Sequence, residues 1–414
     1  MTHIDQFHIE DMMARCSVRG TSLHSEIPPP HNVIKIVSSC TSKPVTLDQR
    51  ALKADKISDK QATNSNNNNN TSNNSGNNDN DSNSSSKSDE CDQALDLTET
   101  VTIQQVPDGD GAPITLGRLY GVWTAPWTSL PEQISRAQRF TFDDRDVILV
   151  GYAKSGTHWL WEILHMLLRN KAEHCQTPKE RLMLSFSTQE YFDMMATPRV
   201  FNTHAPFIAL PIAIKSGRNK CKMVYILRNP KDLAVSYYHH LKAAKEFEYD
   251  GSFRGFLQLF IEGKVPGGSW FDFVLEWEQT LRNNPHLPIL TVHYEDLKED
   301  LGRELRKISS FLEIERSVQL YEAIARECSI NRMREVDAAL KDQFPVNISK
   351  TGKNFIYRKG VVGDWKNWFS VADNERFDCI IAEKLKNSQL RFRYEIKTHP
   401  ECVHPPTGPE GELE

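Results

Sequence analysis

The stretch Asp146-Val-Ile-Leu-Val-Gly-Tyr-Ala-Lys-Ser-Gly-Thr-His-Trp-Leu160 decides the fold of this chain of 414 residues. Val147 to Val150 form an unbroken aliphatic run, which is typical of a strand buried on both faces. Residues 151–156 form a short loop between two glycines, and from Leu160 the apolar residues recur at the spacing of one helix face. A strand, a tight loop and a helix in this order predict an anion site, because the first backbone N–H groups of a helix lack partners.

Side chains of the loop support binding of a phosphate-like group. Gly156 allows the backbone to close around an oxyanion, and Lys154, Ser155 and Thr157 offer a cation and two hydroxyls. The order differs from the Walker A motif, in which lysine follows the second glycine directly, because Thr157 takes that place here. The alternative is an ordinary turn whose Lys154 points into water.

Composition limits the class of protein. The net charge of −5 and the pI near 6.3 argue against general nucleic-acid binding. No apolar run approaches the roughly 20 residues of a membrane span, the first residues lack the pattern of a signal peptide, and the eight cysteines have no paired spacing. We therefore expect a cytoplasmic protein without a nucleic-acid or membrane partner.

The remaining sequence predicts a single P-loop-like three-layer α/β domain, in which helices flank a central parallel sheet. Strand and helix patterns alternate along it, as in doubly wound sheets. An Asn/Ser-rich stretch at residues 63–90 predicts a disordered N-terminal extension over residues 1–112. The domain is expected at 113–396 and a tail at 397–414. Expected strands are 147–150, 200–206, 221–228 and 288–294, and expected helices include 230–241, 270–283 and 297–312.

Two further motifs carry cations. Arg228 ends an expected strand, and Ser236 lies two turns into the helix that follows in Arg-Asn-Pro-Lys-Asp-Leu-Ala-Val-Ser-Tyr-Tyr. The second motif, Tyr357-Arg-Lys-Gly-Val-Val-Gly-Asp-Trp-Lys-Asn-Trp-Phe369, places two cations before two glycines. Together with the loop at Lys154, these motifs resemble those of the cytosolic sulfotransferases. That family moves a sulfuryl group from 3′-phosphoadenosine 5′-phosphosulfate (PAPS) to an alcohol, phenol or amine.

The resemblance implies a role for each motif and no metal. The loop residues Lys154, Ser155, Gly156, Thr157, His158 and Trp159 would hold the 5′-phosphosulfate, although His158 stands where the family usually has threonine or serine. The 3′-phosphate would be bound by Arg228, Ser236, Arg358, Lys359 and Gly360. Tyr294 and Trp159 match the positions that flank the adenine, and Cys328-Ser329 replaces the family's Thr-Ser near the nucleotide.

The segment Asn202-Thr-His-Ala-Pro206 resembles the family's Lys-Thr-His-x-Pro, which implies that His204 is the general base. Neutral imidazole is available at cellular pH, and Lys154 would stabilise charge on the oxygen that leaves sulfur. Asn202 stands where the family has a second lysine, and we expect this to slow the transfer. Residues 366–375 resemble the family's dimer motif and imply a homodimer. The small-molecule acceptor is expected against 177–198, Phe207 and 247–256.

Two other functions stay open at this point. A P-loop kinase shares the fold but needs an acidic residue at the end of a strand to hold Mg²⁺, where this chain has Arg228. A sulfotransferase-like protein that binds the nucleotide with weak or no turnover is the other alternative. Asn202, His158 and Cys328 would be its evidence.

Overall fold

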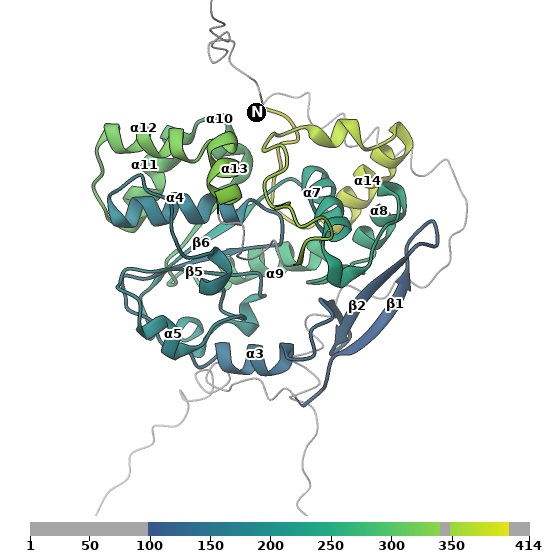
Figure 1. Cartoon of the computed structure of the whole chain (residues 1–414), viewed down its shortest axis with the longest axis horizontal. Coiled ribbons are helices and arrows are strands. Elements are labelled where there is room, and N and C mark those ends of the chain that lie inside the picture. The colour runs from purple at the N-terminus through teal and green to yellow at the C-terminus, as the bar shows by residue number, and fades with distance from the viewer. Residues whose placement is uncertain (1–97, 340–347, 397–414) are drawn as a thin grey trace, which may run out of the picture.

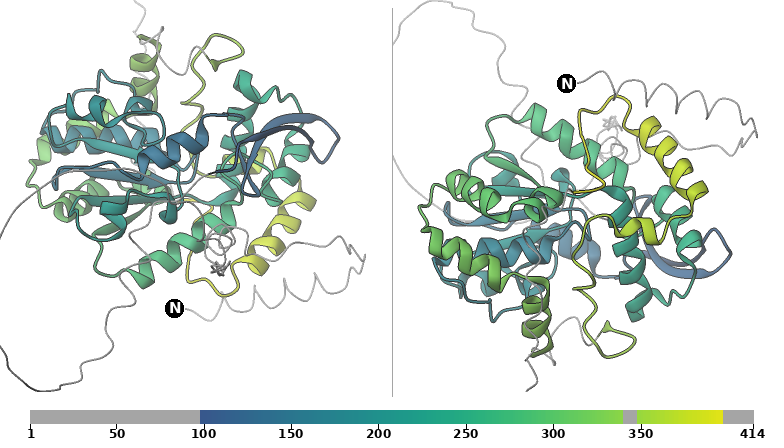
Figure 2. Two further views of the ribbon diagram at one scale, coloured as in Figure 1. Left: turned by 90° about the horizontal axis from the view of Figure 1, so that it is seen from below. Right: turned by 90° about the horizontal axis from the view of Figure 1, so that it is seen from above.

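The computed structural model describes residues 98–339 and 348–396, and its core is a parallel sheet with helices around it (Figure 1). The strand order in this sheet is β5-β4-β6-β7, and all neighbouring strands are parallel. Helices lie on both sides of the sheet in the turned views of Figure 2. The four strands are β4 (Val147–Gly151), β5 (Val200–Thr203), β6 (Lys222–Leu227) and β7 (Ile289–His293).

The predicted strand at residues 147–150 is the centre of this sheet. β4 pairs with β5 on one side and with β6 on the other, and its residues are almost fully buried. The prediction that residues 288–294 form a buried strand is wrong in one respect, because β7 lies at the edge and is mostly half-buried. Only Val292 of β7 is fully enclosed.

Two helices follow the sequence patterns closely. Asn229 caps α7 by accepting a hydrogen bond from the backbone N–H of Asp232, and Pro230 takes the first helical position. The helix predicted at 270–283 is α9. The helix predicted over 297–312 is instead two helices, because Asp300 leaves the helical conformation and caps the second one through Arg303.

The longer helices are α3 (Leu130–Ala137), α4 (Thr157–Arg169), α7 (Pro230–Ala243), α8 (Phe253–Ile261), α9 (Trp270–Asn283), α11 (Leu301–Leu312), α12 (Val318–Glu327), α13 (Ile330–Ala339) and α14 (Val371–Lys384). The shorter ones are α5 (Gln189–Asp193), α6 (Ile212–Lys215) and α10 (Tyr294–Glu299). Single 3₁₀ turns include η2 (Lys179–Leu182), η3 (Phe207–Ala209), η4 (Lys245–Phe247) and η6 (Asp364–Asn367).

A second sheet begins before the predicted domain boundary at residue 112. It is antiparallel, in the order β1 (Thr102–Pro107), β2 (Pro113–Leu119) and β3 (Val122–Thr124). Asp108, in the turn between β1 and β2, accepts a 2.6 Å hydrogen bond from the hydroxyl of Tyr249. The boundary is therefore too late: residues 98–112 belong to the folded part, and the predicted disordered residues before them lie outside the described ones, as does the tail at 397–414.

The order of the strands fixes where a ligand can bind. From β4 the chain moves to β5 on one side and then to β6 on the other, so the connections diverge between β4 and β6. In open α/β sheets ligands bind at such a point, outside the carboxyl ends of the strands. Within the described ranges, no helix is long and apolar enough to cross a bilayer.

Candidate active site

A cavity of about 1290 Å³ opens at the carboxyl ends of β4, β5 and β6. Nearly every residue predicted for the site lines it: Lys154, Gly156, Thr157, His158, Trp159, His204, Arg228, Ser236, Tyr294, Arg358, Lys359 and Gly360. Of the residues expected for the acceptor, Phe207 and residues 248–256 do not line it. Among the residues predicted for the cofactor and catalysis, Ser155 is the exception. Its side chain lies beneath the loop, and its backbone N–H is already bonded to the carbonyl of Tyr152.

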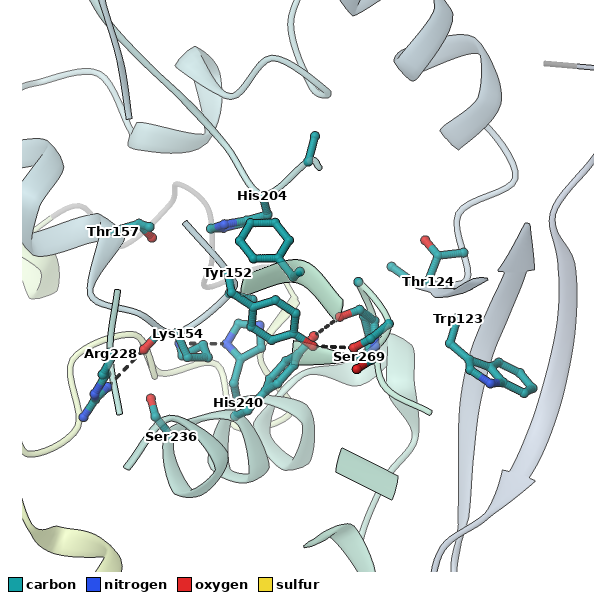
Figure 3. Close-up of a pocket in the computed structure, with 18 of the residues that line it drawn as sticks. Trp123, Thr124, Tyr152, Lys154, Thr157, His204, Arg228, Ser236, His240 and Ser269 are labelled. Carbon is teal, nitrogen blue, oxygen red and sulfur yellow. Dashed lines mark hydrogen bonds between the residues drawn. The ribbon is translucent and has the colours of Figure 1, made fainter. Parts of the chain in front are cut away.

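The loop after β4 holds Lys154 in the left-handed region at a φ of 70°, followed by Gly156 at 101°. Arg228 fixes this turn by donating a 3.0 Å hydrogen bond to the carbonyl of Lys154. The Lys154 ammonium lies 3.3 Å from Nδ1 of His240 on α7 (Figure 3). The loop backbone is therefore positioned by the residue that follows β6, and the lysine by a residue of α7.

Burial shifts the charge balance at this loop. Burial first, and then the nearby charges of Arg228, Lys179 and Arg358, lower the pKa of Lys154 to about 7, although the charge of Glu180 opposes them. Burial also lowers the pKa of His240 well below its usual value, so this ring is neutral and its Nδ1 can accept a hydrogen bond from the ammonium. The charged form of Lys154 is therefore destabilised in the free protein, and a bound anion would stabilise it.

Gly156 offers a test of this loop. A Cβ on Gly156 would lie 2.6 Å from Cδ2 of Tyr294, in a conformation that side chains rarely adopt. We expect Gly156→Ala to cost about 2 kcal/mol of folding stability from backbone strain and contact, and to weaken nucleotide binding by at least about tenfold.

Gly352→Ala is the matched control, because Gly352 also has a positive φ, of 67°, but an added Cβ there meets no atom within 4 Å. Gly352→Ala should lower folding stability through backbone strain but leave the affinity for the nucleotide unchanged. Thermal unfolding and calorimetric titration measure both effects. Equal losses of affinity in the two variants would contradict close approach of a ligand at Gly156.

The second cationic motif, residues 357–369, forms a loop whose positive side chains are partly neutralised by a carboxylate of the same loop. Arg358 and Lys359 each donate a 2.6 Å hydrogen bond to Asp364. Burial alone would raise the pKa of Asp364, but hydrogen bonds from Lys359, Asn367 and Arg358 outweigh it and lower the pKa to about 2. The loop therefore stays preorganised, with Gly360 in the left-handed region at a φ of 67°.

Aromatic rings line the part of the cavity between these two loops. The rings of Trp159 and Tyr294 meet edge to face with centroids 5.5 Å apart. Arg228 places its guanidinium 4.3 Å from the centre of the Tyr294 ring, and its buried Nε has no hydrogen-bond partner among the described residues. The carbonyl of Cys328 accepts a 2.9 Å hydrogen bond from the Trp159 indole. Cys328 therefore holds a ring of the cavity wall through its backbone.

His204 directly follows β5, and its Nδ1 lies 2.6 Å from the carbonyl oxygen of Gly151 at the end of β4. A carbonyl can only accept, so Nδ1 carries the proton and Nε2 keeps its lone pair. Burial first, and then the charge of Lys179, lower the pKa of His204 to about 3, although the bond to Gly151 opposes them. The ring is therefore neutral and oriented, as a general base must be.

Sequence reasoning missed several polar residues of the cavity, among them Lys179, Glu180 and His240. Nε2 of His158 lies 2.7 Å from Oε1 of Glu180, and burial lowers the pKa of His158 to about 4. Residues 177–198 were predicted to line a pocket, and several of them do, but nothing in the sequence marks which side chain enters it. The arrangement combines cationic side chains that can bind an anion with a neutral histidine in the same cavity.

Comparisons with known proteins agree with this chemistry. The sequence model described as "Sulfotransferase domain" matches residues 144–389. Sulfotransferase 1B1 of Canis lupus familiaris is 36% identical over 262 residues, covering 61% of this chain and 87% of its own. Amine sulfotransferase of Oryctolagus cuniculus is 31% identical over 278 residues, covering 66% and 91%.

A solved structure shows the same similarity. The crystal structure of mouse sulfotransferase SULT7A1 complexed with PAP is 31% identical, covers 66% of this chain and 96% of its own, and has a TM-score of 0.53. Retinol dehydratase complexed with androsterone and PAP is 19% identical with a TM-score of 0.55, and shows the shared fold. The family model spans more than half of the chain, and its match includes the loop at Lys154, His204 and both cationic motifs. The chain therefore belongs to the sulfotransferase family.

Proposed function

We propose that this protein transfers a sulfuryl group from PAPS to a hydroxyl or amine of a small molecule, with His204 as the general base. The observation that carries the proposal is the neutral, oriented ring of His204 in the same cavity as Lys154. In the transfer, the acceptor oxygen or nitrogen bonds to sulfur and gives its proton to Nε2 of His204. The sulfur–oxygen bond to the 5′-phosphate breaks, and Lys154 stabilises the charge left on that oxygen.

The residues present fit a nucleotide with two separate phosphate groups. Cations exceed acids in the cavity near both loops, and close backbone approach is possible at Gly156. We assign the 5′ end to the loop from Lys154 to His158 and the adenine to Trp159 and Tyr294. The 3′-phosphate is assigned to Arg228, Ser236, Arg358, Lys359 and Gly360. Arg228 also directly follows β6, where a kinase needs an acid, which favours sulfuryl over phosphoryl transfer.

The pKa of Lys154 makes nucleotide binding depend on pH. A bound anion raises this pKa from about 7 in the free protein, so the complex takes up a proton. Affinity for adenosine 3′,5′-bisphosphate (PAP) should therefore fall as pH rises from about 7 to 9, a range in which the phosphates are already ionised. The decline should approach tenfold per pH unit for one linked proton. Calorimetry across this range measures it, and Lys154→Met should show a nearly flat profile.

For the acceptor we propose phenols and amines. The wall of the cavity near His204 is rich in apolar and aromatic side chains, including Trp127, Phe186 and Phe273. Burial raises the pKa of Glu276, on α9, to about 7, and a cationic amine nearby would favour its ionised form. One relative is named amine sulfotransferase, which supports including amines.

We also propose that the protein works in the cytoplasm and forms a homodimer through residues 366–375. The start of α14 supports the second point, since Val371 is 77% exposed there although it is apolar. Sedimentation of the wild type and of Val371→Glu tests it. A monomeric wild type would exclude the dimer.

Incubation with PAPS labelled in the sulfuryl group and a panel of phenols, alcohols and amines tests the proposed reaction. We expect the label in at least one phenol or amine product, in amounts that depend on protein concentration. Tight binding of adenosine 3′,5′-bisphosphate without transfer to any acceptor would instead identify a nucleotide-binding protein without turnover.

A further inference from the structure

We propose that Lys179 binds the oxygens of the sulfuryl group during transfer and that Asn202 positions it for this purpose. This inference rests on the proposed function and adds a second cation to its site. Lys179 begins η2, in the segment between α4 and β5, and it lines the cavity. Neither the motifs nor the spacing of the sequence points to it.

Asn202 forms hydrogen bonds with both the side chain and the backbone of Lys179. Its Oδ1 accepts a 2.8 Å hydrogen bond from the ammonium of Lys179, and its Nδ2 donates a 2.8 Å hydrogen bond to the backbone carbonyl of the same residue. Asn202 is fully buried on β5. The segment after Lys179 continues along β5, where Met183 bridges to Asn202 and Leu184 donates to its carbonyl. The ammonium is therefore held by a rigid element.

The position of Asn202 places this ammonium on the side of the base. Residues two apart on a strand point to the same face, so Asn202 and His204 face the same way where β5 ends. The charge of Lys179 is a cause of the lowered pKa values of His204, His158 and Lys154, in each case after burial. Lys179 and Lys154 thus share one space with the base.

The ammonium has donors left for a ligand. It carries three N–H groups, and within residues 98–339 and 348–396 its one hydrogen-bond partner is Asn202. The residue is only 4% exposed, and burial lowers its pKa. A buried cation is costly unless an anion meets it. The neighbouring carboxylate of Glu180 is bonded to His158.

Sulfuryl transfer supplies such an anion in the right place. The acceptor–sulfur bond forms on the side of His204, the bond from sulfur to the phosphate oxygen breaks on the side of Lys154, and the acceptor proton goes to His204. The three remaining sulfuryl oxygens carry negative charge throughout. A fixed donor between the base and Lys154 stabilises that charge without having to reorganise.

Lys179→Met tests the proposal, with Lys179→Gln as a second neutral variant that keeps a donor for Asn202. We expect both to lower kcat by about 10²-fold, the usual cost of removing one such donor. Because PAP lacks the sulfuryl group, we expect PAPS affinity to fall by about fivefold or more and PAP affinity to change by less than about twofold. Binding is measured by calorimetry without acceptor.

Lys215→Met is the matched control. Lys215 is another buried lysine, its ammonium bonds to the carbonyl of Ile208, and it is not among the residues that line the cavity. Its kcat should stay within about threefold of the wild type, by the usual small effect of changes outside the site. Melting temperatures of all variants report on folding.

Asn202→Ala tests the positioning role. It leaves the ammonium but removes its anchor, so we expect a kcat loss of about tenfold. Added to Lys179→Met, it should cause little further loss, because the two residues act as one unit. Independent, additive losses would overturn the positioning role.

Other outcomes would also overturn the proposal. They are a kcat of Lys179→Met close to wild type, equal losses of PAP and PAPS affinity, or a rise in acceptor KM with kcat unchanged. If the wild type transfers nothing to any acceptor, the proposed function fails, whereas the comparison of PAPS with PAP still decides the role of Lys179.

Discussion

Replacing His204 by asparagine should lower kcat by about 10³-fold, within the range of general acid–base catalysis. The amide nitrogen of asparagine can still donate to the Gly151 carbonyl, but an amide cannot accept the acceptor's proton. Affinity for PAP should change by less than about threefold, because neither cationic loop is altered. Steady-state kinetics with the best acceptor of the panel and calorimetry with PAP measure the two quantities.

His239→Asn is the control for this substitution. His239 lies on α7 with its ring packed edge to face on Trp368, at 4.5 Å, and it does not line the cavity. Its kcat should stay near that of the wild type. Near-normal turnover in His204→Asn would remove His204 from the mechanism, and loss of PAP binding would show a structural role instead.

The second large effect is expected for Lys154→Met. Loss of this ammonium should lower kcat/KM by about 10³-fold, or about 4 kcal/mol of transition-state stabilisation. PAP affinity should fall by about tenfold at pH 7, since about half of the wild-type lysine is protonated there before binding. We expect the loss in kcat/KM to exceed the loss in PAP affinity, because the charge that grows on the leaving oxygen during transfer depends on a donor already in place.

Lys215→Met serves again as the buried-lysine control, and Lys154→Arg separates charge from shape. Arginine keeps the charge, but its planar fork is longer than an ammonium and does not match the 3.3 Å contact with His240. We expect it to recover binding more than rate. A Lys154→Met enzyme that loses affinity while keeping its kcat would restrict Lys154 to nucleotide binding.

The sequence predicted those parts of the site that depend on local structure. The strand, loop and helix around Lys154 follow from hydrophobic periodicity, and Arg228 lies beside them because it directly follows the neighbouring strand. The match of residues 357–369 to the family motif predicted the second cationic loop, with Arg358, Lys359 and Gly360. All of these lie where a short motif follows a buried strand or forms a glycine-rich loop.

The sequence could not predict contacts that require packing between distant segments. Asn202 was predicted to leave Lys154 as the one lysine at this point, whereas in the structure Asn202 accepts a hydrogen bond from a second lysine that lines the cavity, Lys179. That contact depends on how residues 179–184 run along β5. His240 contacts Lys154 because of how α7 is turned about its own axis. β1 is stabilised by pairing with β2 rather than by a hydrophobic pattern in its own sequence.

The course of residues 179–186 has a consequence for how this enzyme can diversify. The same short segment forms part of the cavity wall through Met183, Ser185 and Phe186, and it carries a lysine anchored to the central sheet. Wall residues of a binding pocket ordinarily vary without affecting the chemical step. Here an insertion that reshaped the wall would also shift the anchored lysine. Divergence toward new acceptors should therefore proceed by exchange of single side chains at this wall, while its length and backbone stay fixed.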